Sequence, residues 1–199
     1  MTIEKKRIHI DAKIHGQALV DDNVEIGART RIWAFSHILS GATIGEDCNV
    51  CDHTFIEGKV ILGNRVTVKC GVYLWDGVIA EDDVSIGPAA VFTNDLKPRS
   101  RQYPQEFAKT VLKQGCSIGA NSTIIAGNII GKWSLVGAGS VITKDVPDYA
   151  AVWGNPAKFQ YWICKCTEKM IFDSLNEFVC KCGEIFSFDK RINLVIKIK

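Results

Sequence analysis

The sequence lacks long apolar runs and a strong excess of charge of either sign. No stretch approaches the roughly 18 consecutive apolar residues of a transmembrane helix, and no apolar segment follows the basic residues Lys5, Lys6 and Arg7. We therefore expect neither a spanning helix nor a signal peptide. The 24 Lys and Arg residues nearly balance the 22 Asp and Glu residues and are scattered along the chain, which gives no indication of nucleic-acid or membrane binding.

Histidine and methionine are also scarce, with 4 and 2 residues, whereas cysteine is not, with 8. Without a signal peptide we expect a cytoplasmic protein whose cysteines are reduced thiols. The 47% apolar and 23% charged residues exclude the disordered and coiled-coil classes. A chain of 199 residues is long enough for one domain and a small appendage.

An aliphatic residue recurs at every sixth position from Ile8 to Phe92. Of the fifteen positions in this series, thirteen hold Ile, Leu or Val. Four residues after each comes a second series of small or β-branched residues, from Ala12 to Ala90, with Leu96 as its last and exceptional member. An α-helix advances 100° per residue and would spread both series around its surface. A period of six instead fits a short strand followed by a turn.

Three such sides make a triangular coil of eighteen residues, in which residues eighteen apart stack at the strand spacing. Glycines directly follow the aliphatic residue at positions 27, 45, 63 and 87, where we expect the missing Cβ to ease the turn. The series resumes at Leu112 and continues to Ile142. The sequence thus predicts an all-β parallel solenoid of about seven coils, with the polar, Pro-containing segment 94–111 extruded as a loop.

Hexads such as Ile26-Gly27-Ala28-Arg29-Thr30-Arg31 and Val136-Gly137-Ala138-Gly139-Ser140-Val141 resemble the hexapeptide-repeat acyltransferases. This resemblance implies a left-handed β-helix, a homotrimer with its sites at subunit interfaces, and an acyl-CoA donor. It covers roughly residues 8–158 of the domain that we expect over residues 1–158. Residues 159–199 are expected to form a small Cys-rich C-terminal extension.

Four further segments, 31–38, 74–78, 92–100 and 144–158, are similar to nucleotide-sugar 3-amino N-acetyltransferases. The form Leu74-Trp75-Asp76-Gly77-Val78 most resembles the enzymes that acetylate dTDP-3-amino-3,6-dideoxyhexoses for surface polysaccharides such as lipopolysaccharide. The resemblance implies acetyl transfer from acetyl-CoA to the 3-amino group. A UDP-linked 2-acetamido-3-amino uronic acid is the alternative acceptor, and a non-catalytic binding scaffold is the alternative class.

This reaction needs an unprotonated amine, a stabilised oxyanion and an acceptor for the amine's proton. The thiolate leaving group can accept that proton, so a protein base is optional. Our candidate catalytic residues are His37, Asp76 and Asn94. Stacking by eighteen places His37 in an aromatic file with Phe55 and Tyr73, and it places Asp76 beneath Asn94. The alternatives are a packed surface histidine and an aspartate that bonds its own turn.

Residues around these positions and in the later coils complete the predicted site. Aromatic, acidic and basic side chains near the loop are candidates for binding the nucleotide sugar: Phe35, His53, Tyr73, Trp75, Asp95 and Arg99. Small residues that let a ligand approach the backbone, and basic residues for the CoA phosphates, are candidates for binding the donor: Ala126, Gly127, Ala138, Gly139, Lys144, Pro156 and Lys158.

Two Cys-x-Cys pairs stand in the C-terminal extension, at Cys164, Cys166, Cys180 and Cys182. Alternate residues of a strand share a face, so four thiolates could hold a structural zinc ion. The usual spacing between zinc ligands is two residues rather than one, and four reduced thiols in a hairpin are the alternative. Cys48 and Cys116 occupy inward positions and are expected in the core.

Overall fold

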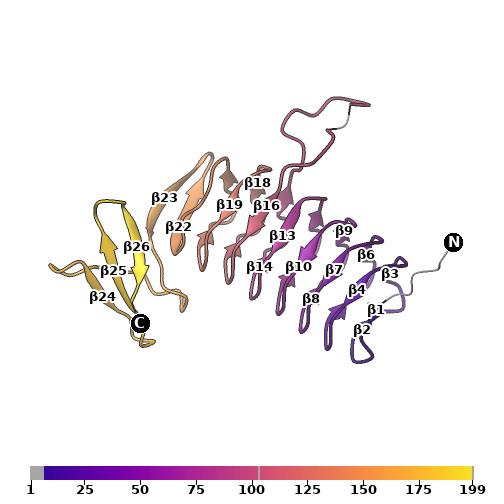
Figure 1. Cartoon of the computed structure of the whole chain (residues 1–199), viewed down its shortest axis with the longest axis horizontal. Coiled ribbons are helices and arrows are strands. Elements are labelled where there is room, and N and C mark those ends of the chain that lie inside the picture. Colours follow the sequence, from indigo (N-terminus) through magenta and orange to yellow (C-terminus); the bar gives the residue numbers. More distant parts are fainter. Residues whose placement is uncertain (1–6, 103, 199) are drawn as a thin grey trace.

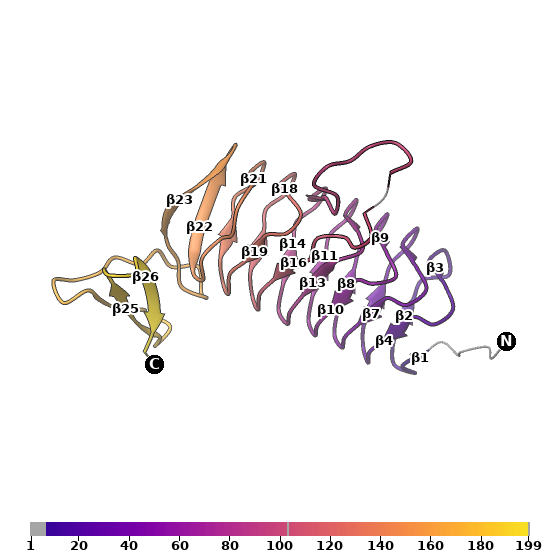
Figure 2. The same ribbon diagram turned by 45° about the horizontal axis from the view of Figure 1, so that its top comes forward.

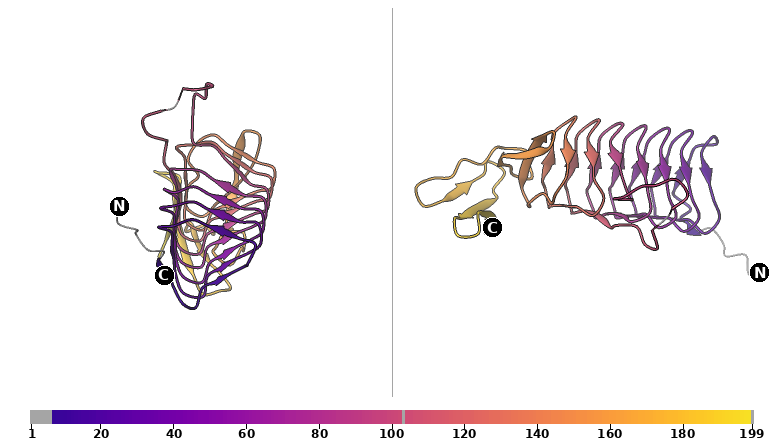
Figure 3. Two further views of the ribbon diagram at one scale, coloured as in Figure 1. Left: turned by 90° about the vertical axis from the view of Figure 1, so that its right-hand side faces the viewer. Right: turned by 90° about the horizontal axis from the view of Figure 1, so that it is seen from above.

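The computed structural model describes residues 7–102 and 104–198, and its strands stack along one long axis (Figure 1). Three sheets of short parallel strands form the sides of a prism, and a small antiparallel sheet follows at the C-terminal end. Seen along the axis, the coils superpose (Figure 3). Among the described residues, no helix is long and apolar enough to cross a membrane.

Each side of the prism takes every third strand. Sheet A consists of β1 (Arg7–Ile8), β4 (Glu25–Ile26), β7 (Thr43–Ile44), β10 (Ile61–Leu62), β13 (Val78–Ala80), β16 (Thr110–Leu112) and β19 (Ile129–Ile130). Sheet B consists of β2 (Lys13–Ile14), β5 (Arg31–Ile32), β8 (Asn49–Val50), β11 (Thr67–Val68), β14 (Ser85–Ile86), β17 (Ser117–Ile118), β20 (Leu135–Val136), β22 (Ala150–Gly154) and β23 (Ala157–Trp162).

Sheet C consists of β3 (Leu19–Val20), β6 (His37–Ile38), β9 (Phe55–Ile56), β12 (Tyr73–Leu74), β15 (Val91–Phe92), β18 (Thr123–Ile124) and β21 (Val141–Ile142). The C-terminal sheet, sheet D, consists of β24 (Glu177–Val179), β25 (Ile185–Asp189) and β26 (Leu194–Lys197).

The strand register confirms the eighteen-residue coil. His37 pairs with Phe55 and Phe55 with Tyr73, whereas Val91 pairs with Thr123 because the loop intervenes. Sheets A and C have seven strands each, and β22 adds a further rung to sheet B. The chain therefore folds as the predicted all-β, left-handed parallel β-helix.

The core lies inside the prism and consists of the two predicted series. From Ile26 to Ile142, every member of the aliphatic series is at most 3% exposed. Ile8 in the first coil is only half-buried, because that coil has a neighbour on one side only. Cys48 and Cys116 lie in the core as predicted, and burial raises the pKa of the Cys116 thiol to about 12. Leu96 was wrongly predicted as an inward residue of the second series, since it lies in the loop and is 61% exposed.

The glycines after the aliphatic residues serve a different purpose from the one expected. The left-handed backbone of the turns falls on larger residues such as Phe35 and His53, with φ of 57° and 56°. A Cβ at Gly45 would instead lie 2.5 Å from the carbonyl oxygen of Gly63 in the next coil. Glycine is therefore required here because successive coils approach closely, not because the turn needs a positive φ.

The extruded loop leaves the β-helix after β15 and returns at β16 (Figure 2). Thr110 and Val111, predicted as its last residues, belong to β16 and pair with Val78 and Ile79. The loop therefore ends before Thr110. The Ala108 N–H donates to the Asn94 carbonyl at 3.4 Å, which brings the two ends of the loop together.

The C-terminal extension covers the open end of the β-helix. Strand β23 crosses the boundary expected at residue 158 and pairs antiparallel with β22. Beyond it, the Tyr149 and Phe186 rings meet at a centroid distance of 5.1 Å, and Phe186 is fully buried. Sheet D thus contacts the last coil through aromatic side chains, and the view from above shows it beyond the C-terminal end of the β-helix (Figure 3).

Replacing Gly45 by alanine should destabilise the protein, because the new Cβ would collide with the backbone of the next coil. We expect a loss of about 1–3 kcal/mol in the free energy of unfolding, measured by chemical denaturation. Gly16→Ala is the matched control, since nothing lies within 4 Å of the added Cβ there. Equal stability of the two variants would contradict the close-approach explanation.

Candidate active site

The turns that join sheet C to sheet A form one corner of the prism, which we call the loop corner: residues 75–77, 93–109, 125–128 and 143–145. The structure brings many of the predicted site residues to this corner, one coil above another. They are Trp75, Asp76, Asn94, Asp95 and Arg99 among the acceptor candidates, and Ala126, Gly127 and Lys144 among the donor candidates.

An aromatic file leads along the outer face of sheet C to the loop corner. The His37 and Phe55 rings lie 5.7 Å apart, and the Phe55 and Tyr73 rings 6.2 Å apart, both edge to face. Trp75 joins the file at 5.5 Å from Phe55. Its Nε1–H donates to the Phe92 carbonyl at 2.9 Å, so the indole is fixed where the loop begins. This surface offers stacking partners for a flat or apolar ligand.

Phe35 and His53 lie at the opposite edge of sheet C, in the turns that join sheet B to sheet C. Their rings are 5.0 Å apart, as the eighteen-residue rule predicts. Ala138 and Gly139 occupy the same kind of turn several coils later. These four candidates are therefore separated from the loop corner by the width of sheet C.

The three candidate catalytic residues do not converge. His37 stands three rungs below the coil from which Asn94 leaves, which corresponds to about 14 Å at strand spacing. Asp76 lies one coil below Asn94 in the loop corner. One substrate atom cannot contact both His37 and Asn94 across that span.

His37 has a partner that the sequence did not reveal. Its Nε2 lies 3.2 Å from Asp21 Oδ1, with both side chains about one-third exposed (37% and 36%). A carboxylate at this nitrogen orients the imidazole. The stacking rule relates only residues that are eighteen apart. Asp21 is sixteen residues from His37, in the turn after β3, so the rule does not pair the two.

The Asp76 carboxylate bonds the neighbouring coil rather than its own turn. Its Oδ1 accepts the Lys59 N–H at 2.8 Å, just as Asp145 Oδ1 accepts the Ile129 N–H at 2.8 Å. The Asp76 N–H in turn donates to Glu57 Oε2 at 2.5 Å. The Asp76 carboxylate is thus held in place by the neighbouring coil.

A cavity of about 290 Å³ opens at the base of the loop. Its lining combines polar and apolar side chains: Asn94, Asp95, Leu96, Lys97, Pro104, Glu106 and Ala108. Asp95 Oδ1 accepts the Lys97 N–H at 2.8 Å, which fixes its carboxylate. Arg99 lies outside this lining, exposed, with its Nη1 on the Pro98 carbonyl.

The donor candidates offer less free backbone than the sequence suggested. The Ala126 N–H donates to Thr93 Oγ1 at 2.9 Å, and the Gly127 N–H donates to Thr110 Oγ1 at 3.2 Å. The Gly139 N–H donates to the Ala120 carbonyl at 2.8 Å. These N–H groups are already engaged, although Gly127, Ala138 and Gly139 are exposed to an approaching ligand.

Lys144 and Lys158, both predicted to bind the CoA phosphates, line one cavity of about 350 Å³ beside the last coil, together with Asp145. Val146, Pro147 and Phe159 also contribute to its walls. Pro156 lies just outside it, in the turn between β22 and β23. Two cations above an apolar wall suit a ligand with phosphate groups and an apolar portion.

A larger recess, of about 820 Å³, lies at the N-terminal end and was not predicted. Its cations include Arg29 and Arg31. Arg29 is engaged in a two-pronged pair with Asp47, with both contacts at 2.7 Å, and it lowers the pKa of that carboxyl group. Arg65 and Asp83 repeat the pair two coils later, so this pairing is a recurring corner contact.

Two models of hexapeptide-repeat families match segments of the chain that form coils of the β-helix. The model of the bacterial transferase hexapeptide (six repeats) matches residues 23–58, and that of the hexapeptide repeat of succinyl-transferase matches residues 114–144. The dTDP-3-amino-3,6-dideoxy-alpha-D-galactopyranose 3-N-acetyltransferase of Aneurinibacillus thermoaerophilus is 55% identical over 159 residues, covering 80% of this chain and 82% of that protein.

Among solved structures, UDP-N-acetylglucosamine acyltransferase from Campylobacter jejuni superposes with a TM-score of 0.53. The match covers 78% of this chain and 74% of that one, at 15% sequence identity. At this identity the likeness concerns the fold alone.

Proposed function

Because the chain belongs to the bacterial hexapeptide-repeat transferases, we propose that it transfers the acetyl group of acetyl-CoA to the 3-amino group of a dTDP-3-amino-3,6-dideoxyhexose. The observation that carries this proposal is the 55% identity, over 82% of its length, to a relative named for this reaction. The same relative favours the galacto configuration of the sugar. The product would be a 3-acetamido sugar for surface polysaccharides such as lipopolysaccharide.

In the proposed reaction the sugar amine attacks the thioester carbonyl. The new C–N bond forms, the C–S bond breaks, and the proton lost by the nitrogen passes to the departing CoA thiolate. This route needs no protein base at the reacting atoms, which suits a corner from which His37 is about 14 Å away. The protein's main contribution is then to hold the two substrates in line.

The acceptor sugar is proposed to lie at the loop corner. Trp75 and Tyr73 supply aromatic surface, and Asn94, Asp95 and Asp76 supply polar groups for the hexose hydroxyls and the amine. Arg99, in the extruded loop, is proposed to bind the pyrophosphate. Phe35 and His53, at the far edge of sheet C, would contact the outer part of the nucleotide or a neighbouring subunit.

The donor is proposed to run along the later coils toward the C-terminal end. Lys144 and Lys158 would bind CoA phosphates at their shared cavity. Since the N–H groups of Ala126, Gly127 and Gly139 are engaged, the carbonyls of these turns and of Ala138 are the groups for the pantetheine amides. Pro156 would close one wall of this path.

We also propose a homotrimer whose sites lie between subunits, in the cytoplasm. Exposed apolar residues on the outer faces, such as Leu19, Ile61 and Val91, support an association of prisms side by side. The proposed substrates, acetyl-CoA and a nucleotide sugar, support the cytoplasmic location.

Product formation over a panel of amino sugars tests the proposed acceptor. The purified protein would be supplied with acetyl-CoA and the dTDP-linked 3-amino-3,6-dideoxy sugars in galacto and gluco form, or with the UDP-linked 2-acetamido-3-amino uronic acid. We expect the highest kcat/KM for the dTDP-galacto sugar. Product formation would be measured by mass spectrometry, because the chain's own 8 cysteines would disturb a thiol assay.

Turnover of the UDP sugar without activity on either dTDP sugar would contradict the proposed acceptor. Absence of turnover together with absence of CoA binding in calorimetry would instead favour a non-catalytic scaffold. If the protein bound CoA but turned over none of these sugars, the proposed acceptor alone would be wrong.

Replacing His37 by asparagine should lower kcat/KM modestly, by about tenfold or less, because its ring supports the aromatic file from a distance. Asp21→Asn is the matched variant, since it removes only the partner of the imidazole, and we expect a smaller effect. Steady-state kinetics with circular dichroism as a control for folding provide the measurement. Complete loss of activity in a folded His37→Asn protein would show that a protein base is needed.

A further inference from the structure

Two turns of the C-terminal extension have the same sequence pattern, Cys-Lys-Cys-x-Glu, at residues 164–168 and 180–184. They also have the same hydrogen bonds. The Cys164 N–H donates to the Glu168 carbonyl and the Cys180 N–H to the Glu184 carbonyl, each at 2.8 Å. The fourth residue has left-handed backbone in both, with φ of 72° at Thr167 and 91° at Gly183. The two turns are therefore structural copies, although they lie sixteen residues apart.

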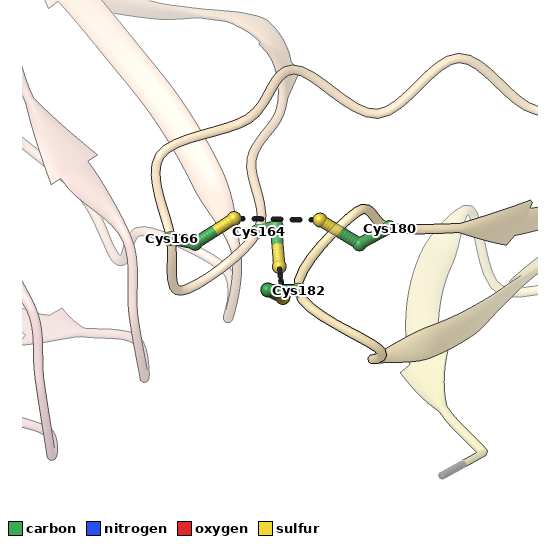
Figure 4. Close-up of side chains that lie close together, drawn as sticks. All are labelled: Cys164, Cys166, Cys180 and Cys182. Carbon is green, nitrogen blue, oxygen red and sulfur yellow. Dashed lines mark hydrogen bonds between the residues drawn. The ribbon is translucent and has the colours of Figure 1, made fainter.

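The copies face each other and point all four sulfur atoms into one space (Figure 4). Cys164 Sγ lies 3.5 Å from Cys182 Sγ, and Cys166 Sγ lies 3.3 Å from Cys180 Sγ. All four Sγ atoms lie within 4.8 Å of one another. A tetrahedron with metal–sulfur bonds of about 2.3 Å has sulfur–sulfur edges of about 3.8 Å, which falls within this range.

We propose that these four cysteines bind one zinc ion and that this ion fixes sheet D to the end of the β-helix. Four thiolates in a tetrahedron select zinc over the hard cations Mg²⁺ and Ca²⁺, which prefer oxygen ligands. All four positions are protein ligands, so the site is closed and its role is structural. The one-residue spacing within each pair is unusual, but each turn supplies two ligands as a conventional zinc-binding turn does.

The charges around the cluster repeat the same symmetry. Lys165 of the first turn forms an ion pair with Glu184 of the second, and Lys181 of the second forms one with Glu168 of the first. Lys197 adds a third cation at 2.5 Å from Glu184. A zinc ion with four thiolates carries a net charge of −2, and the three lysines with their two glutamate partners leave a net +1 that offsets part of it.

The position of the cluster indicates what the metal would hold together. The first turn follows β23, which is paired with the β-helix through β22. The second turn leads directly into β25, the central strand of sheet D. Units of fewer than about 40 residues usually need a metal, disulfides or oligomerisation for stability, and the part of the chain after β23 is of this size. The metal would therefore reinforce the aromatic contacts, such as that of Tyr149 with Phe186, that join sheet D to the last coil.

Metal analysis of the full chain tests this inference independently of the proposed reaction. Protein prepared with zinc and dialysed against metal-free buffer should retain about one zinc per chain. The double variant Cys166→Ala/Cys182→Ala should retain almost none. Cys70→Ala is the matched control, because Cys70 is an exposed cysteine outside the cluster, and it should retain the wild-type amount.

Cobalt substitution of the wild-type protein gives a second readout that does not depend on the folding of a variant. Tetrahedral thiolate ligation should produce thiolate-to-cobalt charge-transfer absorption and intense visible d–d bands. Chelation of the metal should make the region after residue 162 sensitive to protease while the β-helix stays resistant. Wild-type protein without zinc, with stoichiometric iron instead, or with disulfides among these four cysteines would overturn the inference.

Discussion

The close, in-register approach of successive coils is the constraint on which the rest of the structure depends. Parallel strands pair every eighteen residues, and their backbones come so near at the corners that Gly45 has no room for a Cβ. The register directs one aliphatic and one small residue inward on every side. It also converts separations along the chain into columns on the surface, and the aromatic file of His37, Phe55 and Tyr73 is one such column.

The period of six was sufficient to predict the parallel solenoid, the core and the stacked aromatic residues, because each follows from the register alone. The left-handedness was implied by the family resemblance. It was not sufficient where side chains bond across a corner. Asp21 reaches His37 from a turn sixteen residues earlier, and Asp76 is held by the backbone of the neighbouring coil. Such contacts depend on the turn geometry rather than on the period. Leu96 was misassigned because the numerical series continues two residues into a loop that has already left the coil.

The sequence also did not reveal how the predicted site residues are arranged in space. The sequence suggested the same role for Lys144 and Lys158, and the return of β23 along β22 shows that they line one cavity. His37, Asp76 and Asn94 looked like one catalytic set in the sequence, yet the ladder spreads them over several rungs. The four cysteines of the extension, in contrast, do lie together. Their spacing was only a weak indication, but the repeated hydrogen bonds of the two turns and the ion pairs between them define the arrangement of the cluster.

In the proposed function, the loop corner binds the acceptor sugar, the cavity of Lys144 and Lys158 binds the donor, and the cysteine cluster secures the far end. The reaction then depends on placing an amine against a thioester rather than on a dedicated base. A crystal structure with CoA and the dTDP-linked 3-amino-3,6-dideoxygalactose tests this account most directly. It predicts the sugar amine beside the CoA sulfur at the loop corner, near Trp75 and Asn94. A nucleotide sugar bound instead in the N-terminal recess of Arg29 and Arg31 would contradict it.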